Sequence, residues 1–180
     1  MAVPAHLGSM LNSAADLMTK LVVFDLDETL WSLSEGYCAL MRPPWRRQGD
    51  QISDASGLHL TLRPDARDTL DALEERGLLL SAASRSTPET AGEILKLLDL
   101  FARFLCPCLA WQDKDLSLDQ ILQDLDREKG IRLAPNDVLF VDDWPSNIRD
   151  ARKIGIPGLV FGRDIHSLSE VLDHVNGGSG

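Results

Sequence analysis

The stretch from Leu21 to Trp31 constrains the fold more than any other part of this chain. A run of apolar strand formers, Leu-Val-Val-Phe, stops at two acids, Asp25 and Asp27, and Thr29 follows them. Residues two apart leave a strand on the same side, so we expect the two carboxylates to aim at one point. Acids this close repel each other, and a bound divalent cation is the simplest remedy. The stretch therefore predicts a buried strand that ends at a cation site.

Short apolar runs alternate with amphipathic helical patterns along the rest of the chain. Runs that are apolar on both faces are typical of a buried parallel sheet. The predicted strands are Leu21–Leu26, Leu78–Ala83, Phe104–Ala110, Val138–Asp142 and Gly158–Phe161. Helices are predicted to begin near Pro64, Thr87, Ser117, Pro145 and Leu168. This alternation predicts a doubly wound α/β sandwich with a central parallel sheet.

The chain is long enough for one domain. Its 180 residues are 44% hydrophobic, which suffices for an extended core. Residues 1–19 show no clear period and are interpreted as a leader or tag-like segment. Residues 20–175 form the predicted domain, and the Gly-rich residues 176–180 are expected to be a flexible tail.

Residues 32–62 interrupt the alternation, because they are far longer than an ordinary connection between a strand and a helix. They include the alternating segment 57–62 and the basic residues Arg42, Arg46 and Arg47. We interpret the segment as a small hairpin insertion over the carboxyl end of the sheet, where α/β proteins bind ligands. It is too short for a large cap domain. The alternative is a solvated surface flap.

Charge and cysteine content narrow the functional classes. A formal net charge of −10 argues against nucleic-acid binding, which requires a basic face. No apolar run approaches the ~20 residues that span a bilayer, so no membrane association is expected. The cysteines, Cys38, Cys106 and Cys108, are odd in number and form no disulfide framework. These features predict a cytoplasmic protein.

Polar side chains follow the ends of several predicted strands. Those residues are Asp25 and Asp27, then Ser84 and Arg85, then Lys114, and finally Asp142, Asp143 and Asn147. Because the carboxyl ends of parallel strands lie on one edge of a sheet, these groups are expected to converge.

The converging groups have complementary chemistry. Carboxylates are hard oxygen ligands suited to Mg²⁺, which prefers to share phosphate oxygens with its protein site. Ser84 and the N–H groups after it form an anion cradle, and Lys114 adds a positive charge. Together they describe phosphoryl transfer through an aspartyl-phosphate. Two alternatives stay open: Lys114 belongs to a solvated charged turn, or Arg85 forms a surface ion pair instead of reaching a substrate phosphate.

These segments, in this order, resemble the four motifs of the haloacid dehalogenase superfamily. The Asp-x-Asp-x-Thr motif is matched by Asp25, Asp27 and Thr29, and the second and third motifs are matched by Ser84 and Lys114. The fourth motif is matched by Asp142-Asp143 and Asn147, and the likeness extends over residues 20–165. Within the superfamily, the chain is most similar to the capless magnesium-dependent phosphatases. The resemblance implies a three-layer Rossmann-like sandwich without a large cap domain.

The resemblance also implies a role for each matched residue. Asp25 would be the nucleophile, and Asp27 would be the general acid and then the base. Mg²⁺ would be held by Asp25, the backbone carbonyl of Asp27 and Asp142. The substrate side would include Ser84, Arg85 and Lys114, with Thr29 steadying the loop after the nucleophile. Asp143 and Asn147 would orient Lys114 or the metal-bound waters.

The resulting prediction is a Mg²⁺-dependent phosphomonoesterase. Its substrate would be a phosphorylated small molecule or a phosphoprotein, including phosphotyrosine. One alternative is phosphoryl or glyceryl transfer to a carrier protein. Another is a non-catalytic, receiver-like phosphorylation switch, but a receiver has no need of an acid such as Asp27 two residues after its nucleophile.

Overall fold

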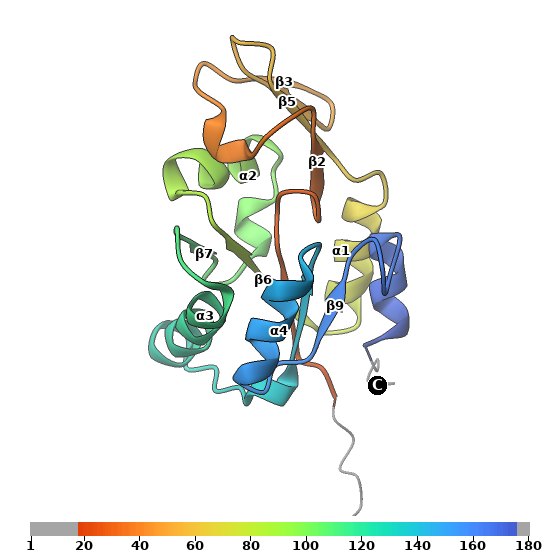
Figure 1. Ribbon diagram of the computed structural model, residues 1–180. Coiled ribbons are helices and arrows are strands. Elements are labelled where there is room, and N and C mark those ends of the chain that lie inside the picture. The colour runs from red at the N-terminus through yellow and green to blue at the C-terminus, as the bar shows by residue number, and fades with distance from the viewer. Residues whose placement is uncertain (1–17, 176–180) are drawn as a thin grey trace, which may run out of the picture.

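A five-stranded parallel sheet forms the centre of the computed structural model, which describes residues 18–175 (Figure 1). Its strands, in spatial order, are β7 (Cys108–Leu109), β6 (Leu79–Ser84), β1 (Leu21–Phe24), β8 (Val138–Asp142) and β9 (Gly158–Val160). The central strand β1 pairs in parallel with β6 on one side and β8 on the other. The predicted parallel α/β fold is confirmed. The predicted leader, apart from its last two residues, and the predicted tail lie outside the described residues.

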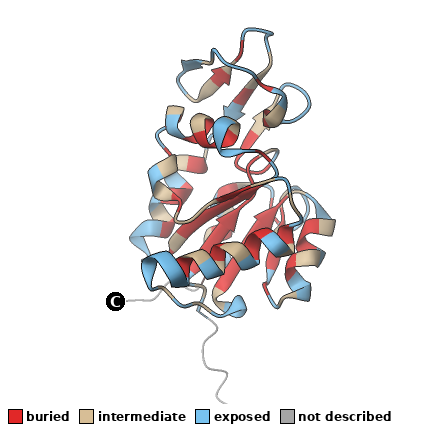
Figure 2. Ribbon diagram, turned by 90° about the vertical axis from the view of Figure 1, so that its left-hand side faces the viewer, coloured by how far each residue is buried: buried red, intermediate tan, exposed pale blue. Residues whose placement is uncertain are grey.

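Helices cover both faces of this sheet and make three layers. On one face lie α1 (Ala66–Glu75), a π-helical turn (Pro88–Gly92) that continues into α2 (Glu93–Leu97), and a 3₁₀ helix (Leu168–Asp173). On the other face lie α3 (Lys114–Lys129) and α4 (Pro145–Lys153). Figure 2 shows the buried strands between the exposed outer sides of the helices.

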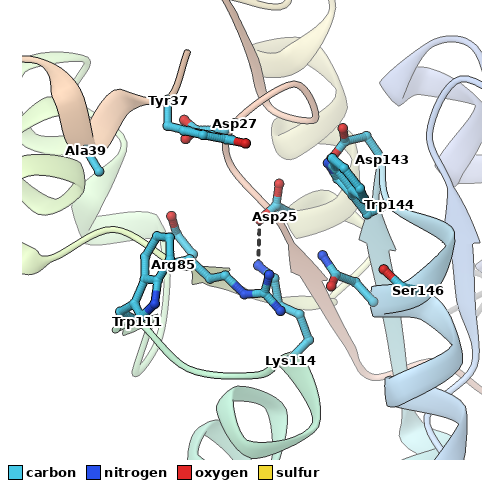
Figure 3. Close-up of a pocket in the computed structure, with 12 residues that line it drawn as sticks. Asp25, Asp27, Tyr37, Ala39, Arg85, Trp111, Lys114, Asp143, Trp144 and Ser146 are labelled. Atoms are coloured by element: carbon cyan, nitrogen blue, oxygen red, sulfur yellow. Dashed lines mark hydrogen bonds and ion pairs between the residues drawn. The ribbon is translucent and has the colours of Figure 1, made fainter.

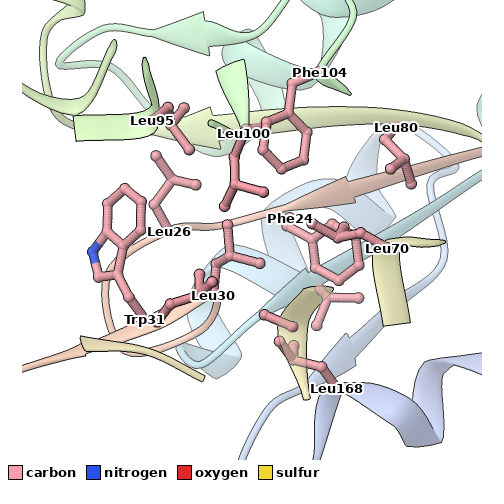
Figure 4. Packing of buried hydrophobic residues seen from close by; sticks show 14 of the residues in the cluster. Phe24, Leu26, Leu30, Trp31, Leu70, Leu80, Leu95, Leu100, Phe104 and Leu168 are labelled. Atoms are coloured by element: carbon pink, nitrogen blue, oxygen red, sulfur yellow. The ribbon is translucent and has the colours of Figure 1, made fainter. Parts of the chain in front are cut away.

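The alternation of side chains along β1 explains the two apolar cores. Val22 and Phe24 face one core, together with Leu70 of α1 and Leu95 of α2 (Figure 4). Leu21 and Val23 point to the opposite face, where the inner residues of α3 and α4 pack. Because every residue of β1 is buried, the strand reads as a continuous apolar run.

Several predicted boundaries are wrong. Only β7 forms within the strand expected over 104–110. Pro107 has no backbone N–H to donate to a neighbouring strand, and Cys106 has a φ of 45°, which is not an extended conformation. The helix expected from Ser117 begins three residues earlier, at Lys114, and Ser117 lies inside its first turns. The last predicted helix is a 3₁₀ helix.

The insertion has the predicted extent but contains more strands than the predicted hairpin. It forms a four-stranded antiparallel sheet in the order β2 (Trp31–Leu33), β5 (His59–Leu62), β4 (Gln51–Ser53) and β3 (Arg46–Gln48), and its long loop carries a 3₁₀ helix (Cys38–Leu40). Figure 1 shows these strands above the carboxyl ends of the central sheet, as predicted. Ile52 and Leu60 are fully buried and join the main core, so the segment is not a solvated flap. Among the described residues, no helix has both the length and the apolar character needed to cross a membrane.

Candidate active site

The loop after β1 places Asp25 at the carboxyl edge of the sheet. Its backbone N–H donates to the carbonyl of Val141, which continues the pairing of β1 with β8. Its side chain is almost buried, and Oδ1 accepts a hydrogen bond of 2.6 Å from Nζ of Lys114 (Figure 3). A charge-assisted hydrogen bond from the start of α3 therefore holds Asp25 in place.

Lys114 is the first residue of α3 and is 1% exposed. Its ammonium donates to Asp25 and to the carbonyl of Ala83 at the end of β6, and it lies 3.6 Å from Oδ2 of Asp142. The alternative of a solvated charged turn is therefore wrong for Lys114. A buried lysine needs such partners to keep its charge.

Three carboxylates form a cluster beside this ammonium. Oxygens of Asp25, Asp142 and Asp143 all lie within 4.8 Å of one another. Burial, and then repulsion by Asp25, raises the pKa of Asp142 to about 7 and that of Asp143 to about 6. Carboxylates that are costly to ionise together are suited to a hard divalent cation. The carboxylate of Asp27 is not part of this cluster.

The neighbours of the cluster orient its acids. Nδ2 of Asn147 lies 3.0 and 2.9 Å from the two oxygens of Asp142, and the backbone N–H of Trp144 donates to one of them at 2.8 Å. The hydroxyl oxygen of Thr29 accepts the backbone N–H of Asp143 at 3.1 Å. Thr29 is fully buried and does not line the cavity, so the structure places it behind the site.

Ser84 is the last residue of β6 and Arg85 follows it, on the opposite side of Asp25 from β8. Oγ of Ser84 accepts the backbone N–H of Ser86 at 3.2 Å, which leaves the hydroxyl hydrogen free to donate into the cavity. Arg85 lines the same cavity, but its guanidinium is bonded to the carbonyl of Gln112 and to the carboxylate of Asp113. The surface ion pair of Arg85 therefore exists, and a substrate contact stays a prediction.

Asp27 lines the cavity from the side of the insertion (Figure 3). Its Oδ1 accepts the indole N–H of Trp31 at 2.7 Å, and its Oδ2 accepts the backbone N–H of Cys38 at 3.1 Å. Burial raises the pKa of the Asp27 carboxyl, although these hydrogen bonds act in the opposite direction. A raised pKa is what an acid that donates a proton near neutral pH requires.

These residues surround an open cavity of about 270 Å³. Its lining residues are Asp25, Asp27, Tyr37, Ala39, Ser84, Arg85, Trp111, Lys114, Asp143, Trp144, Ser146 and Asn147. We call the exposed aromatic side chains among them, Tyr37, Trp111 and Trp144, the aromatic rim. No sequence signal indicates Trp111, which lies in a loop between β7 and α3. Trp144 directly follows the acids of the fourth motif, so its position at the site could have been inferred.

The basic residues of the insertion do not line the cavity. Arg42 donates to the carbonyls of Ala39 and Met41, and Arg47 donates to the carbonyl of Leu97 and to Asp99. Arg46 is exposed on β3. Arg42 therefore stabilises the loop of the insertion, and Arg47 joins the insertion to the end of α2.

Known proteins share both the sequence and the fold of this chain. A family model described as Acid Phosphatase matches residues 17–168. The chain is 30% identical over 160 residues to the Homo sapiens protein Magnesium-dependent phosphatase 1, covering 87% of this chain and 86% of that protein. Among solved structures, a HAD-superfamily hydrolase from Ehrlichia chaffeensis matches with a TM-score of 0.63 at 14% identity, over 87% of this chain and 96% of that one. Another, from Geobacter sulfurreducens, matches with a TM-score of 0.59 at 14% identity, over 87% and 100%.

Proposed function

The chain belongs to the Acid Phosphatase family within the haloacid dehalogenase superfamily, and on that premise we propose that it is a Mg²⁺-dependent phosphatase whose nucleophile is Asp25. One observation carries the proposal. The Asp25 carboxylate lines an open cavity, 2.6 Å from a buried ammonium and beside two further carboxylates. A nucleophile, a positive charge for phosphate and a cation site are thus within reach of one phosphoryl group.

Asp25 begins the reaction. A carboxylate oxygen of Asp25 attacks phosphorus, the bond from phosphorus to the leaving oxygen breaks, and an aspartyl-phosphate forms. Lys114 and the hydroxyl of Ser84 hold the phosphoryl oxygens and offset the charge that develops on them. Because Lys114 already bonds to Asp25, its charge is in place before substrate binds.

Asp27 handles the protons of both half-reactions. It gives a proton to the leaving oxygen as the phosphorus–oxygen bond breaks. It then takes a proton from the water that attacks the aspartyl-phosphate, which releases inorganic phosphate and restores Asp25. Its position at the cavity, outside the carboxylate cluster, supports this separate role.

The carboxylate cluster fits a magnesium ion. Three carboxylates face the one ammonium of Lys114, so two negative charges are in excess when all groups are ionised. Asp25, Asp142 and the backbone carbonyl of Asp27 would hold the ion, and Asp143 is close enough to join them or to bind its waters. When bound, Mg²⁺ supplies Lewis-acid stabilisation of charge on the phosphoryl oxygens.

The substrate is a phosphate monoester, and the surroundings of the cavity favour an apolar or aromatic leaving group. The aromatic rim is more than half exposed at each residue, at 57% for Tyr37, 77% for Trp111 and 58% for Trp144. Aromatic side chains offer contact area and flat faces to a planar group. A tyrosine phosphate on a protein or a small aryl phosphate fits this description.

Replacing the nucleophile tests the proposal. Asp25→Asn should reduce the hydrolysis of p-nitrophenyl phosphate in the presence of Mg²⁺ to background, because the amide cannot form the intermediate. EDTA should abolish the activity of the unaltered protein, and added Mg²⁺ should restore it. The matched control is Asp68→Asn, the same change at an exposed position of α1, which should retain full activity.

Phosphate release separates hydrolysis from transfer. Inorganic phosphate and nitrophenol should appear in equal amounts, since water is the acceptor. Substantial activity in the Asp25→Asn protein, or nitrophenol without phosphate, would contradict the proposal.

A further inference from the structure

Both oxygens of the Asp27 carboxylate are held by donors that come from the base of the insertion. The indole N–H of Trp31 binds Oδ1 at 2.7 Å, and the backbone N–H of Cys38 binds Oδ2 at 3.1 Å. Trp31 and Cys38 are both fully buried, so neither donor can easily move away. A carboxylate held on both oxygens has a defined direction, unlike a side chain that is free to rotate.

The backbone between these residues is built to bring the donors to Asp27. The N–H groups of Leu30 and Trp31 both donate to the carbonyl of Leu26, which closes a tight turn around the acid. Glu28, the residue after Asp27, has a φ of 57°, a conformation that is uncommon for residues other than glycine. Such local strain persists only where the surrounding structure requires it.

The secondary structure of the insertion holds both donors in position. Trp31 begins β2 and pairs with Leu62 of β5, so its position depends on the antiparallel sheet of the insertion. Cys38 begins the 3₁₀ helix Cys38–Leu40 in the loop between β2 and β3. The insertion therefore holds the carboxylate of Asp27 at two points.

We propose that Trp31 and the backbone N–H of Cys38 are positioning elements that direct Asp27 toward the leaving oxygen of the substrate. The proposal rests on the proposed function of this site. Each carboxylate oxygen has two lone pairs, so one hydrogen bond to each oxygen leaves a further site for the transferred proton. A small error in the direction of that proton costs rate, because proton transfer requires hydrogen-bond geometry.

The dependence of rate on the leaving group separates positioning from simple structural support. Protonation matters greatly for an alkyl alcohol, a poor leaving group, and little for nitrophenol. In Trp31→Phe, which keeps an aromatic ring but removes the N–H, kcat/KM for an alkyl phosphate should fall by about tenfold or more. The loss for p-nitrophenyl phosphate should be no more than about twofold.

Trp45 provides a matched control. It lies in the same insertion, and its buried indole nitrogen has no hydrogen-bond partner within residues 18–175. Trp45→Phe makes the same chemical change and should alter kcat/KM for the two esters by the same factor.

A second pair of variants tests the donor from Cys38. Cys38→Pro removes the backbone N–H at the first position of a 3₁₀ helix, where proline is tolerated, and Tyr37 before it is already extended, with φ −133° and ψ 152°. Cys38→Ala removes the thiol and keeps the N–H. The proline variant should show a selective loss on the alkyl ester that exceeds any loss in the alanine variant. Both variants remove the thiol, which also acts on the Asp27 carboxyl, so the difference between them reports the N–H. Thermal unfolding of each variant identifies any that does not fold.

The outcomes are distinct. Equal losses on both esters in Trp31→Phe and Cys38→Pro, or the same selectivity in Trp45→Phe, would overturn the positioning role and leave the proposed function intact. An unaltered protein that hydrolyses neither ester with Mg²⁺ would instead overturn the proposed function, and the positioning role with it.

Discussion

Lys114 shows how much a single residue contributes to this site. Its ammonium is buried between the end of β6 and the carboxylates of Asp25 and Asp142. Among the described residues, Lys114 is the cation that pairs with these two acids. Removal of one partner from a buried ion pair is strongly destabilising, because it leaves an unpaired charge. Lys114 thus supports the folded carboxylate cluster as well as the proposed binding of phosphate.

The raised pKa values of Asp142 and Asp143 make the effect of magnesium on stability depend on pH. Both values, about 7 and about 6, exceed the ordinary value of 3.8. From about pH 4 to about pH 7 these two acids in the folded metal-free protein therefore keep protons that they have lost in the unfolded chain, so their contribution to stability falls as the pH rises through this window. Mg²⁺ held by the ionised carboxylates, as proposed, should compensate for that loss.

We accordingly expect Mg²⁺ to raise the melting temperature clearly at about pH 8 and much less at about pH 5. Thermal unfolding with and without saturating Mg²⁺ measures the difference. Asp142→Asn removes one charge of the cluster and should weaken the response at about pH 8. An equal response to Mg²⁺ at both pH values in the unaltered protein would contradict this prediction.

At the scale of elements, the insertion depends on a loop that Asp54 organises. One oxygen of its carboxylate accepts the backbone N–H of Ser56 at 2.8 Å, the hydroxyl of Ser56 at 2.6 Å and the backbone N–H of Leu58 at 3.1 Å. The other oxygen accepts the backbone N–H of Arg42 at 3.1 Å. Asp54 therefore joins the connection between β4 and β5 to the long loop that contains Cys38.

Asp54→Ala should lower the melting temperature by roughly 4–10 °C, because several donors lose one charged acceptor. Ser56→Ala is the matched control, since it removes only the hydroxyl donor and should cost about 1 kcal/mol. Thermal unfolding of both variants checks that Asp54→Ala destabilises the protein more than Ser56→Ala does. An unchanged melting temperature in Asp54→Ala would contradict this prediction.

At the scale of the whole molecule, exposed apolar surface is concentrated around one opening. The large exposed apolar side chains of the described residues are Met18, Tyr37, Leu40, Trp111, Leu116 and Trp144. The aromatic rim lines the cavity, and Leu116 lines a shallow depression that Trp111 shares. Grouped apolar residues beside a polar site are typical of a binding surface. Apolar side chains therefore surround the proposed phosphate-binding centre and are available to contact the rest of the substrate.

The aromatic rim should determine affinity more than chemistry. Trp111→Ser and Trp144→Ser should each raise KM for an aryl phosphate by about fivefold to tenfold and change kcat little, because each loses stacking contact worth about 1 kcal/mol. KM for a small alkyl phosphate should change less. Met18→Ser, at an exposed apolar residue that does not line the cavity, is the control. Equal effects of the tryptophan variants on both esters would exclude a role in recognising the leaving group.

The local pattern of the sequence determined the sheet and the placement of its acids. Val138–Asp142 was predicted with the bounds that β8 has, because a buried parallel strand must be apolar on both faces. The convergence of Asp25, Lys114 and Asp142 followed from the geometry of parallel strands, whose carboxyl ends meet at one edge. The roles of these residues remain proposals.

Only the tertiary structure decided what surrounds the acids. The bonds from Trp31 and Cys38 to Asp27 and the position of Trp111 depend on how loops turn and pack. The periodicity that identifies strands and helices carries no information about such turns, since hydrophobic spacing records burial and not loop direction. The sequence thus determined which groups meet at the edge of the sheet, and the packing of the insertion decided where Asp27 is aimed.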